Sequence, residues 1–123
     1  MPREWKPMTG LRRGDVVLVW FPNSDLATFK RRPALVVESN ELNTGLPQVV
    51  IAMVTSNPLR HGHPSRVIIP LNSPTAKGTG LRTDSVVMTD NLATVLDKAI
   101  ESRLGQLTDM TAVDQALRTT LAL

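Results

Sequence analysis

Turn-forming residues recur at short intervals between residues 14 and 105, and the apolar runs between them are short and rich in β-branched side chains. Runs of about four to eight such residues, bounded by Gly, Pro or Asn, are typical of strands, because helices need longer periodic stretches. The sequence therefore predicts a small, mainly β domain. The expected strands lie at residues 16–21, 33–37, 48–55, 66–71, 85–88 and 92–95.

The segment at residues 48–55 is an almost wholly apolar run. A strand with one exposed face alternates polar and apolar side chains, so a continuous apolar run indicates that both faces are covered. We expect this strand at the centre of the sheet. Two long polar loops, at residues 56–65 and 72–83, are the expected carriers of binding groups, because long loops on a small scaffold commonly hold them.

The pattern changes after Gly105, where apolar residues recur at helical rather than strand spacing. Thr108 or Asp109 is placed to cap the first turn. The spacing predicts one C-terminal amphipathic helix whose apolar face packs on the sheet. That face consists of Leu107, Met110, Val113, Leu117 and Leu121.

A chain of 123 residues has room for one compact core of ordinary size. We expect a single domain at residues 11–123, preceded by a flexible tail at residues 1–10. The tail is polar, contains Pro2 and Pro7, and lacks the apolar stretch of a signal peptide. Since the sequence has no cysteine and no apolar run near the roughly 20 residues that span a bilayer, we expect a cytoplasmic protein.

The positive charge is unevenly distributed along the chain. Residues 1–82 hold 11 of the 14 Lys and Arg residues but only 5 of the 11 Asp and Glu residues. A basic surface on this part of the chain favours a flexible polyanion as partner, although a solvated basic face is the alternative.

Short motifs in a fixed order are similar to those of the MazF/PemK family of toxin ribonucleases. Each motif alone is weak, because strands commonly follow Gly-Asp or precede Pro, but their order and spacing extend from residue 14 to the C-terminus. The motifs are RGDVV at 13–17, RPALVV at 32–37, VTS at 54–56, TDSVV at 83–87, DNL at 90–92, DK at 97–98 and LGQLT at 104–108.

The resemblance implies a small SH3-like or CcdB-like twisted β-barrel with one C-terminal helix, assembled as a homodimer. It implies a substrate groove at the dimer interface and cleavage of single-stranded RNA, such as mRNA, at short sequence motifs. A cognate antitoxin would neutralise the toxin by occupying that groove.

The resemblance places two catalytic residues in this chain, Arg32 and Thr55. An RNA strand supplies its own nucleophile, the 2′-hydroxyl, so the protein must mainly stabilise negative charge and move protons. Arginine remains cationic and its forked donors match phosphoryl oxygens, while a threonine hydroxyl can donate to a nonbridging oxygen. On spacing alone, a surface arginine and a strand-end threonine bonded to backbone would be the preferred interpretations, and the resemblance along the whole chain reverses that preference.

Further residues are expected to contact RNA. Lys30 and Arg31 would attract phosphates, and polar edges of unstacked bases could bind the side chains near residues 85–91. Solvated charges and turn hydrogen bonds are the competing interpretations. The expected RNA-binding set is Asn23, Lys30, Arg31, Ser56, Ser85, Asp90 and Asn91.

The acid-base partner is the open part of this hypothesis. Many family members carry a glutamate in the first loop, where this chain has no acidic residue between Asp25 and Lys30. Asp25, His61 and His63 are the titratable candidates in nearby loops. Two histidines without a neighbouring cysteine or carboxylate make a poor zinc set, so we expect neither a metal nor a cofactor.

The missing loop glutamate also leaves an alternative function open. The chain could be a noncatalytic toxin or an RNA- or protein-binding module of the same fold, such as a CcdB-like toxin that binds DNA gyrase. The combination of Arg32 with Thr55 favours the enzyme.

Overall fold

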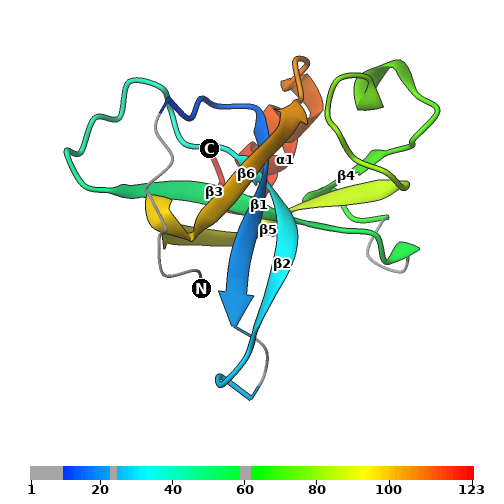
Figure 1. Cartoon of the computed structure of the whole chain (residues 1–123). Helices are drawn as coiled ribbons and strands as arrows, with labels where there is room; N and C mark the ends of the chain where they lie inside the picture. The colour runs from blue at the N-terminus through cyan, green and yellow to red at the C-terminus, as the bar shows by residue number, and fades with distance from the viewer. Residues whose placement is uncertain (1–9, 23–24, 59–61) are drawn as a thin grey trace.

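The computed structural model describes residues 10–22, 25–58 and 62–123, which form one antiparallel sheet and one α-helix (Figure 1). Six strands lie in the order β4-β5-β3-β2-β1-β6, and all of their pairings are antiparallel. The elements are β1 (Asp15–Pro22), β2 (Phe29–Val36), β3 (Gln48–Thr55), β4 (Arg66–Ile69), η2 (Pro74–Ala76), β5 (Ser85–Leu96), η3 (Asp97–Ala99), β6 (Ile100–Gln106) and α1 (Thr111–Leu121).

The expected mainly β fold with one C-terminal helix is confirmed, and the sheet is open at β4 and β6. The apolar run at 48–55 is a central strand, as predicted, because β3 pairs with β2 on one side and β5 on the other. In Figure 1, β1 and β2 run down the view whereas β3 and β5 run across it. This strong twist separates the two halves of the sheet at one corner.

Alternating side chains build a separate core on each face of the sheet. The helix-side cluster lies under α1, where Val113 is fully buried, and the opposite cluster lies on the other face. The helix-side cluster includes Val16, Leu35, Val54, Ile69, Val87, Leu107 and Val113. The opposite cluster includes Val17, Val19, Ala34, Val36, Ile51, Met53 and Ile100.

The predicted strands at 85–88 and 92–95 are one strand, β5, with a bulge between them. Met53 and Ala52 are consecutive in β3, yet they pair with Met88 and Leu92, so three residues of β5 have no partner in that ladder. Thr89 is fully buried and anchors the bulge, because its Oγ1 donates to Ser65 O at 2.6 Å. The sequence correctly indicated an interruption between residues 88 and 92, but β5 pairs with β3 on both sides of that interruption.

The sequence analysis missed one strand near the C-terminus and placed the start of the helix too early. Residues 100–106 form β6, an edge strand whose exposed polar residues hid it from the apolar pattern. The helix begins at Thr111, so Leu107 is a buried loop residue and not part of the helix. Met110 is the N-cap residue, while Asp109 accepts a hydrogen bond from Thr111 N at 3.1 Å.

The basic residues that precede the expected strand at 33–37 are themselves part of a strand. Residues 30–32 belong to β2, where they pair with β1 from Phe21 to Val19. The predicted strand 66–71 is shorter than expected and ends at Ile69. Within the described ranges, no helix is both long and apolar enough to cross a membrane.

Candidate active site

Strands β2 and β3 separate after a short ladder and leave a fork between them. Their pairing runs only from Val36–Ile51 to Ala34–Met53. Pro33 stands directly beyond the last pair and has no N–H to donate to a ladder. From there β2 continues along β1, whereas β3 continues along β5.

Arg32 and Thr55 lie at the mouth of this fork. Each is two residues beyond the Ala34–Met53 pair on its own strand, so strand alternation directs both side chains to the same face of the sheet. Both line a cavity of about 640 Å³. The two residues that the sequence analysis paired are therefore brought together by the tertiary structure.

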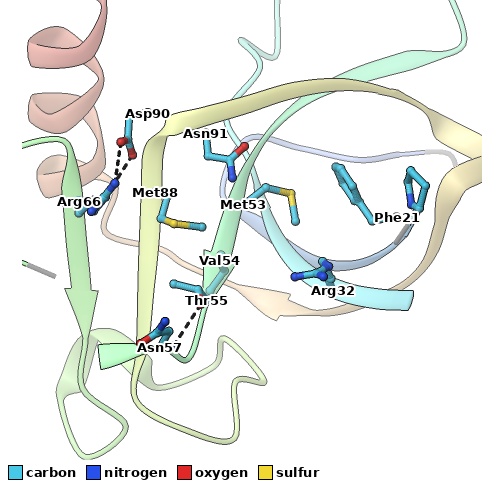
Figure 2. Close-up of a pocket in the computed structure, with 11 residues that line it drawn as sticks. Phe21, Arg32, Met53, Val54, Thr55, Asn57, Arg66, Met88, Asp90 and Asn91 are labelled. Atoms are coloured by element: carbon cyan, nitrogen blue, oxygen red, sulfur yellow. Dashed lines mark hydrogen bonds and ion pairs between the residues drawn. The ribbon is translucent and has the colours of Figure 1, made fainter. Parts of the chain in front are cut away.

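This cavity, which we call the fork hollow, combines an apolar floor with polar walls. Figure 2 shows Phe21 and Arg32 at one side, Arg66 and Asp90 at the other, and Met53 and Met88 between them. The lining residues are Phe21, Pro22, Arg32, Met53, Val54, Thr55, Asn57, Arg66, Met88, Asp90 and Asn91.

The Thr55 hydroxyl is held as a hydrogen-bond acceptor. Its Oγ1 accepts from Asn57 N at 3.1 Å (Figure 2), which fixes the side chain at the strand end. A hydroxyl that accepts one bond can still donate its own proton, so Thr55 is suited to donate to a phosphoryl oxygen. Arg32 is exposed, and among the residues that the structure describes it forms no ion pair.

Asp90 and Asn91 reach the fork hollow because the β5 bulge displaces them from the ladder. Asp90 is engaged by Arg66 through two hydrogen bonds, from Nη2 to Oδ2 at 2.9 Å and from Nε to Oδ1 at 3.3 Å. These bonds hold the pKa of Asp90 below its ordinary value. Asp90 is therefore a charged acceptor that already has a cationic partner.

A second cavity of about 610 Å³, which we call the loop hollow, also includes Arg32 and Thr55. The other expected RNA-binding residues of the described chain, Lys30, Arg31, Ser56 and Ser85, line it. The lining residues are Leu18, Lys30, Arg31, Arg32, Pro33, Val54, Thr55, Ser56, Gly80, Leu81, Arg82, Thr83, Ser85 and Leu104.

Two members of this set have structural partners of their own. Arg31 pairs with Glu101 at 3.0 Å, and its guanidinium carbon lies 5.9 Å from the centroid of the Trp20 ring. Ser85 is buried and its Oγ donates to Thr83 O at 3.0 Å. Of the expected residues, Asn23 lies outside the described part of the chain.

The two acid-base candidates that the structure describes, Asp25 and His63, line neither hollow. Asp25 Oδ1 accepts from Ala27 N and Thr28 N, and these bonds hold the pKa of Asp25 below its ordinary value. A lowered pKa makes a carboxylate a weaker base. His63 Nδ1 accepts from Ser65 N at 3.1 Å, and His61 lies outside the described residues.

The sequence analysis missed several residues of the two hollows. Arg66 and Arg82 are single arginines in polar surroundings, where no local pattern marks them. Phe21, Met53 and Met88 have the sequence pattern of ordinary strand residues, and in the structure they do lie in strands. They also line the floor of the fork hollow.

The fold and the site together define a class of protein. A small antiparallel sheet presents an arginine and a hydroxyl at the end of a ladder, between two open hollows with basic walls. This arrangement suits a protein that binds the backbone of a nucleic acid.

Comparison with known proteins gives the family. A family model described as "PemK-like, MazF-like toxin of type II toxin-antitoxin system" matches residues 12–121. The chain therefore belongs to this toxin family. It is 34% identical over 105 residues to endoribonuclease MazF6 of Mycobacterium tuberculosis and to endoribonuclease MazF2 of Mycobacterium bovis, covering 83% of this chain and 88% of each relative.

Solved structures agree with this membership. An endoribonuclease from a mycobacterial species has a TM-score of 0.69 and 27% identity, covering 94% of this chain and 95% of that chain. An endoribonuclease in complex with its cognate antitoxin, also mycobacterial, has a TM-score of 0.71 and 24% identity, covering 93% and 97% of the two chains. This second likeness supports the fold.

Proposed function

We propose that this toxin is a metal-independent endoribonuclease that cleaves single-stranded RNA, with Arg32 and Thr55 at the scissile phosphate. The observation that carries the proposal is the fork, where two residues 23 positions apart meet at one cavity. The relatives that share 34% of the sequence are named endoribonucleases, which supports the same activity here.

The proposed reaction uses the substrate's own 2′-hydroxyl. Its oxygen gives up its proton to water and attacks the adjacent phosphorus, the bond from phosphorus to the 5′-oxygen breaks, and the 5′-oxygen takes up a proton from water. The products are a 2′,3′-cyclic phosphate and a 5′-hydroxyl end. Negative charge grows on the nonbridging oxygens along this path, so preorganised donors at those oxygens accelerate it.

Arg32 and Thr55 suit two different parts of this task. Arg32 supplies a permanent positive charge with forked donors that can bridge phosphoryl oxygens. Thr55 supplies a neutral donor whose position is fixed by its bond to Asn57 N. Both line the same hollow from separate strands, and we therefore assign both to the scissile phosphate of one bound RNA.

The fork hollow is suited to an unpaired nucleobase. Phe21 offers a ring, Met53 and Met88 offer an apolar surface, and Asn91 offers an amide with both donors and acceptors. Single-stranded RNA fits these features better than a duplex, since bases in a duplex are stacked and paired.

The expected partners follow from the same proposal. We propose a homodimer in the cytoplasm whose domain extends over residues 11–123 and whose RNA groove is covered by a cognate antitoxin. One solved structure of the same fold is an endoribonuclease in complex with its cognate antitoxin, which supports an antitoxin as the partner. Light scattering at micromolar concentration should give twice the mass of the chain, and a fully active monomer would contradict the homodimer.

The noncatalytic alternative predicts RNA or protein binding without cleavage. It is disfavoured because the curated relatives covering most of this chain are named endoribonucleases. The missing loop glutamate, which motivated the alternative, does not remove either Arg32 or Thr55 from the fork.

The proposal is tested by incubating purified protein with a long single-stranded RNA in the presence of a chelator and mapping the cut ends. We expect cuts at a short motif, with cyclic phosphate and 5′-hydroxyl termini. An RNA with a 2′-deoxy residue at the mapped position should resist cleavage at that position. A strict requirement for a divalent metal, or cleavage of the 2′-deoxy substrate, would refute the mechanism.

A further inference from the structure

We propose that the loop hollow is a binding tract for the RNA backbone next to the cleaved phosphate, and that Arg82 is a phosphate-binding residue in it. The inference rests on the proposed RNA substrate and extends it to a second surface. Arg82 lies in the segment at residues 78–83, and no residue of that segment belonged to the expected RNA-binding set.

The two hollows lie on opposite faces of the sheet and meet at the fork. The fork hollow is floored by Phe21 and Met53, which pack with the opposite cluster, whereas the loop hollow contains Leu81 and Leu104, which pack with the helix-side cluster. Arg32 and Thr55 belong to both hollows. A strand of RNA held at the fork would therefore continue from one face onto the other.

Among the residues that the structure describes, the loop hollow is lined by four cations and by no carboxylate. The charge of Arg31 is partly neutralised by Glu101. Lys30 and Arg82, in contrast, form no ion pair with any residue in the described ranges. Unneutralised cations on one exposed wall are suited to phosphates, since binding then releases counterions from the nucleic acid.

Hydroxyl groups add neutral donors to the same wall. Ser56 follows Thr55 directly, and Thr83 follows Arg82 directly. Phosphate contacts from such side chains position a nucleic acid without reading its sequence. The loop hollow is therefore expected to strengthen RNA binding and to fix the position of the RNA strand, whereas the fork hollow contacts a base.

The segment that carries Arg82 is held rigidly against β6. Gln106 N donates to Gly78 O at 2.8 Å, and Thr79 is fully buried. A Cβ at Gly80 would lie 2.3 Å from Leu104 O, so the two backbones are in direct contact. Because this contact fixes the start of the segment, Arg82 is presented toward the fork from a preorganised position.

The test compares RNA binding by wild type, Arg82→Ala and Arg82→Lys at several salt concentrations. The probe is an RNA of the mapped cleavage sequence that carries a 2′-deoxy residue at the cut position, so it binds without being cut. Loss of one phosphate contact to a single strand should reduce the salt slope of log K by about 0.7. We expect this reduction and about tenfold weaker binding for Arg82→Ala, and a near-normal slope for Arg82→Lys.

Arg118→Ala is the matched control, because Arg118 is an exposed arginine on α1 that lines neither hollow. It should bind with the wild-type slope. With a cleavable substrate, Arg82→Ala should raise KM and leave kcat close to the wild-type value, since the chemical step takes place at the fork. A purely structural role for Arg82 would instead lower the active fraction and leave the salt slope unchanged.

The outcomes separate this inference from the proposed function. If wild type cleaves RNA and Arg32→Ala does not, but Arg82→Ala keeps the full salt slope, the activity stands and the backbone tract is refuted. If wild type cleaves no RNA, the proposed function itself fails. Loss of polyglutamate binding by Arg82→Ala, with an unchanged RNA slope, would assign the hollow to an acidic protein and overturn the RNA tract.

Discussion

Arg32 of β2 and Thr55 of β3 each lie two residues beyond the Ala34–Met53 pair, at the point where their strands separate. Had the ladder continued past Pro33, these residues would have faced each other as a cross-strand pair. Because it ends there, the space between the strands is open and both side chains reach it from rigid elements. Sites built on strand ends in this way hold their geometry better than sites carried by loops alone.

Arg32→Ala and Thr55→Ala should each lower the single-turnover cleavage rate by about 10² to 10³, because each removes one donor to the transition state. Circular dichroism should show that both variants remain folded, since Arg32 is exposed and Thr55 lies at a strand end. Thr119→Ala, at an exposed helical threonine, is the control and should cleave normally. Wild-type rates in both site variants would remove the assignment.

The double change His61→Ala plus His63→Ala should alter the rate by less than about tenfold, which is below the usual contribution of general acid-base catalysis. His63 is bonded through Nδ1 to the Ser65 backbone and lines neither hollow. The measurement is the single-turnover rate as a function of pH for both proteins. A variant that loses most of its activity, together with a titration near neutrality, would make the histidines catalytic.

Arg66→Ala should raise the pKa of Asp90 toward its ordinary value of 3.8, because the Arg66 hydrogen bonds are the main cause of its lowering. A carboxyl whose pKa is lower in the folded state stabilises the fold at pH values above its unfolded pKa. That contribution is lost as the pH falls through the folded pKa. Carbon-13 NMR of the Asp90 carboxyl gives the titration directly.

The same spectra contain a control for the Asp90 titration. The pKa of Asp109 is lowered by hydrogen bonds from Thr111, so Arg66→Ala should leave it unchanged. The side chains of Arg66 and Asp90 are 24% and 38% exposed, so a double-mutant cycle with Asp90→Asn should give less than about 1 kcal/mol of coupling. An unmoved Asp90 titration in Arg66→Ala would show that the ion pair does not form in solution.

Gly105→Ala should destabilise the protein by about 3 kcal/mol or more, at the upper end of the cost of overpacking a filled site. A Cβ at this position would lie 2.2 Å from Gly78 O, so the backbone of either segment would have to move. Urea denaturation at a fixed protein concentration measures the change. Gly45→Ala is the comparison, because Gly45 has φ +77 but open space, and should cost only about 1 to 2 kcal/mol.

Local signals in the sequence were sufficient for most of the strands and for the central position of β3, because a continuous apolar run within a few residues marks a doubly covered strand. The pairing of Arg32 with Thr55 came instead from the resemblance to the family. The same signals were misleading for β6 and for the start of α1. An edge strand needs no apolar alternation on its exposed side, and Leu107 is apolar because it is buried in a loop.

The tertiary structure alone decided which distant residues share the site. Arg66 and Asp90 are separated by 24 residues and meet because the β5 bulge turns Asp90 out of its ladder. The segment with Arg82 reaches the fork because Gly80 and Gly105 allow two backbones to touch. Such contacts depend on strand register, on bulges and on close packing between elements. These features are set by how the whole sheet fits together, so a local pattern of residue types does not reveal them.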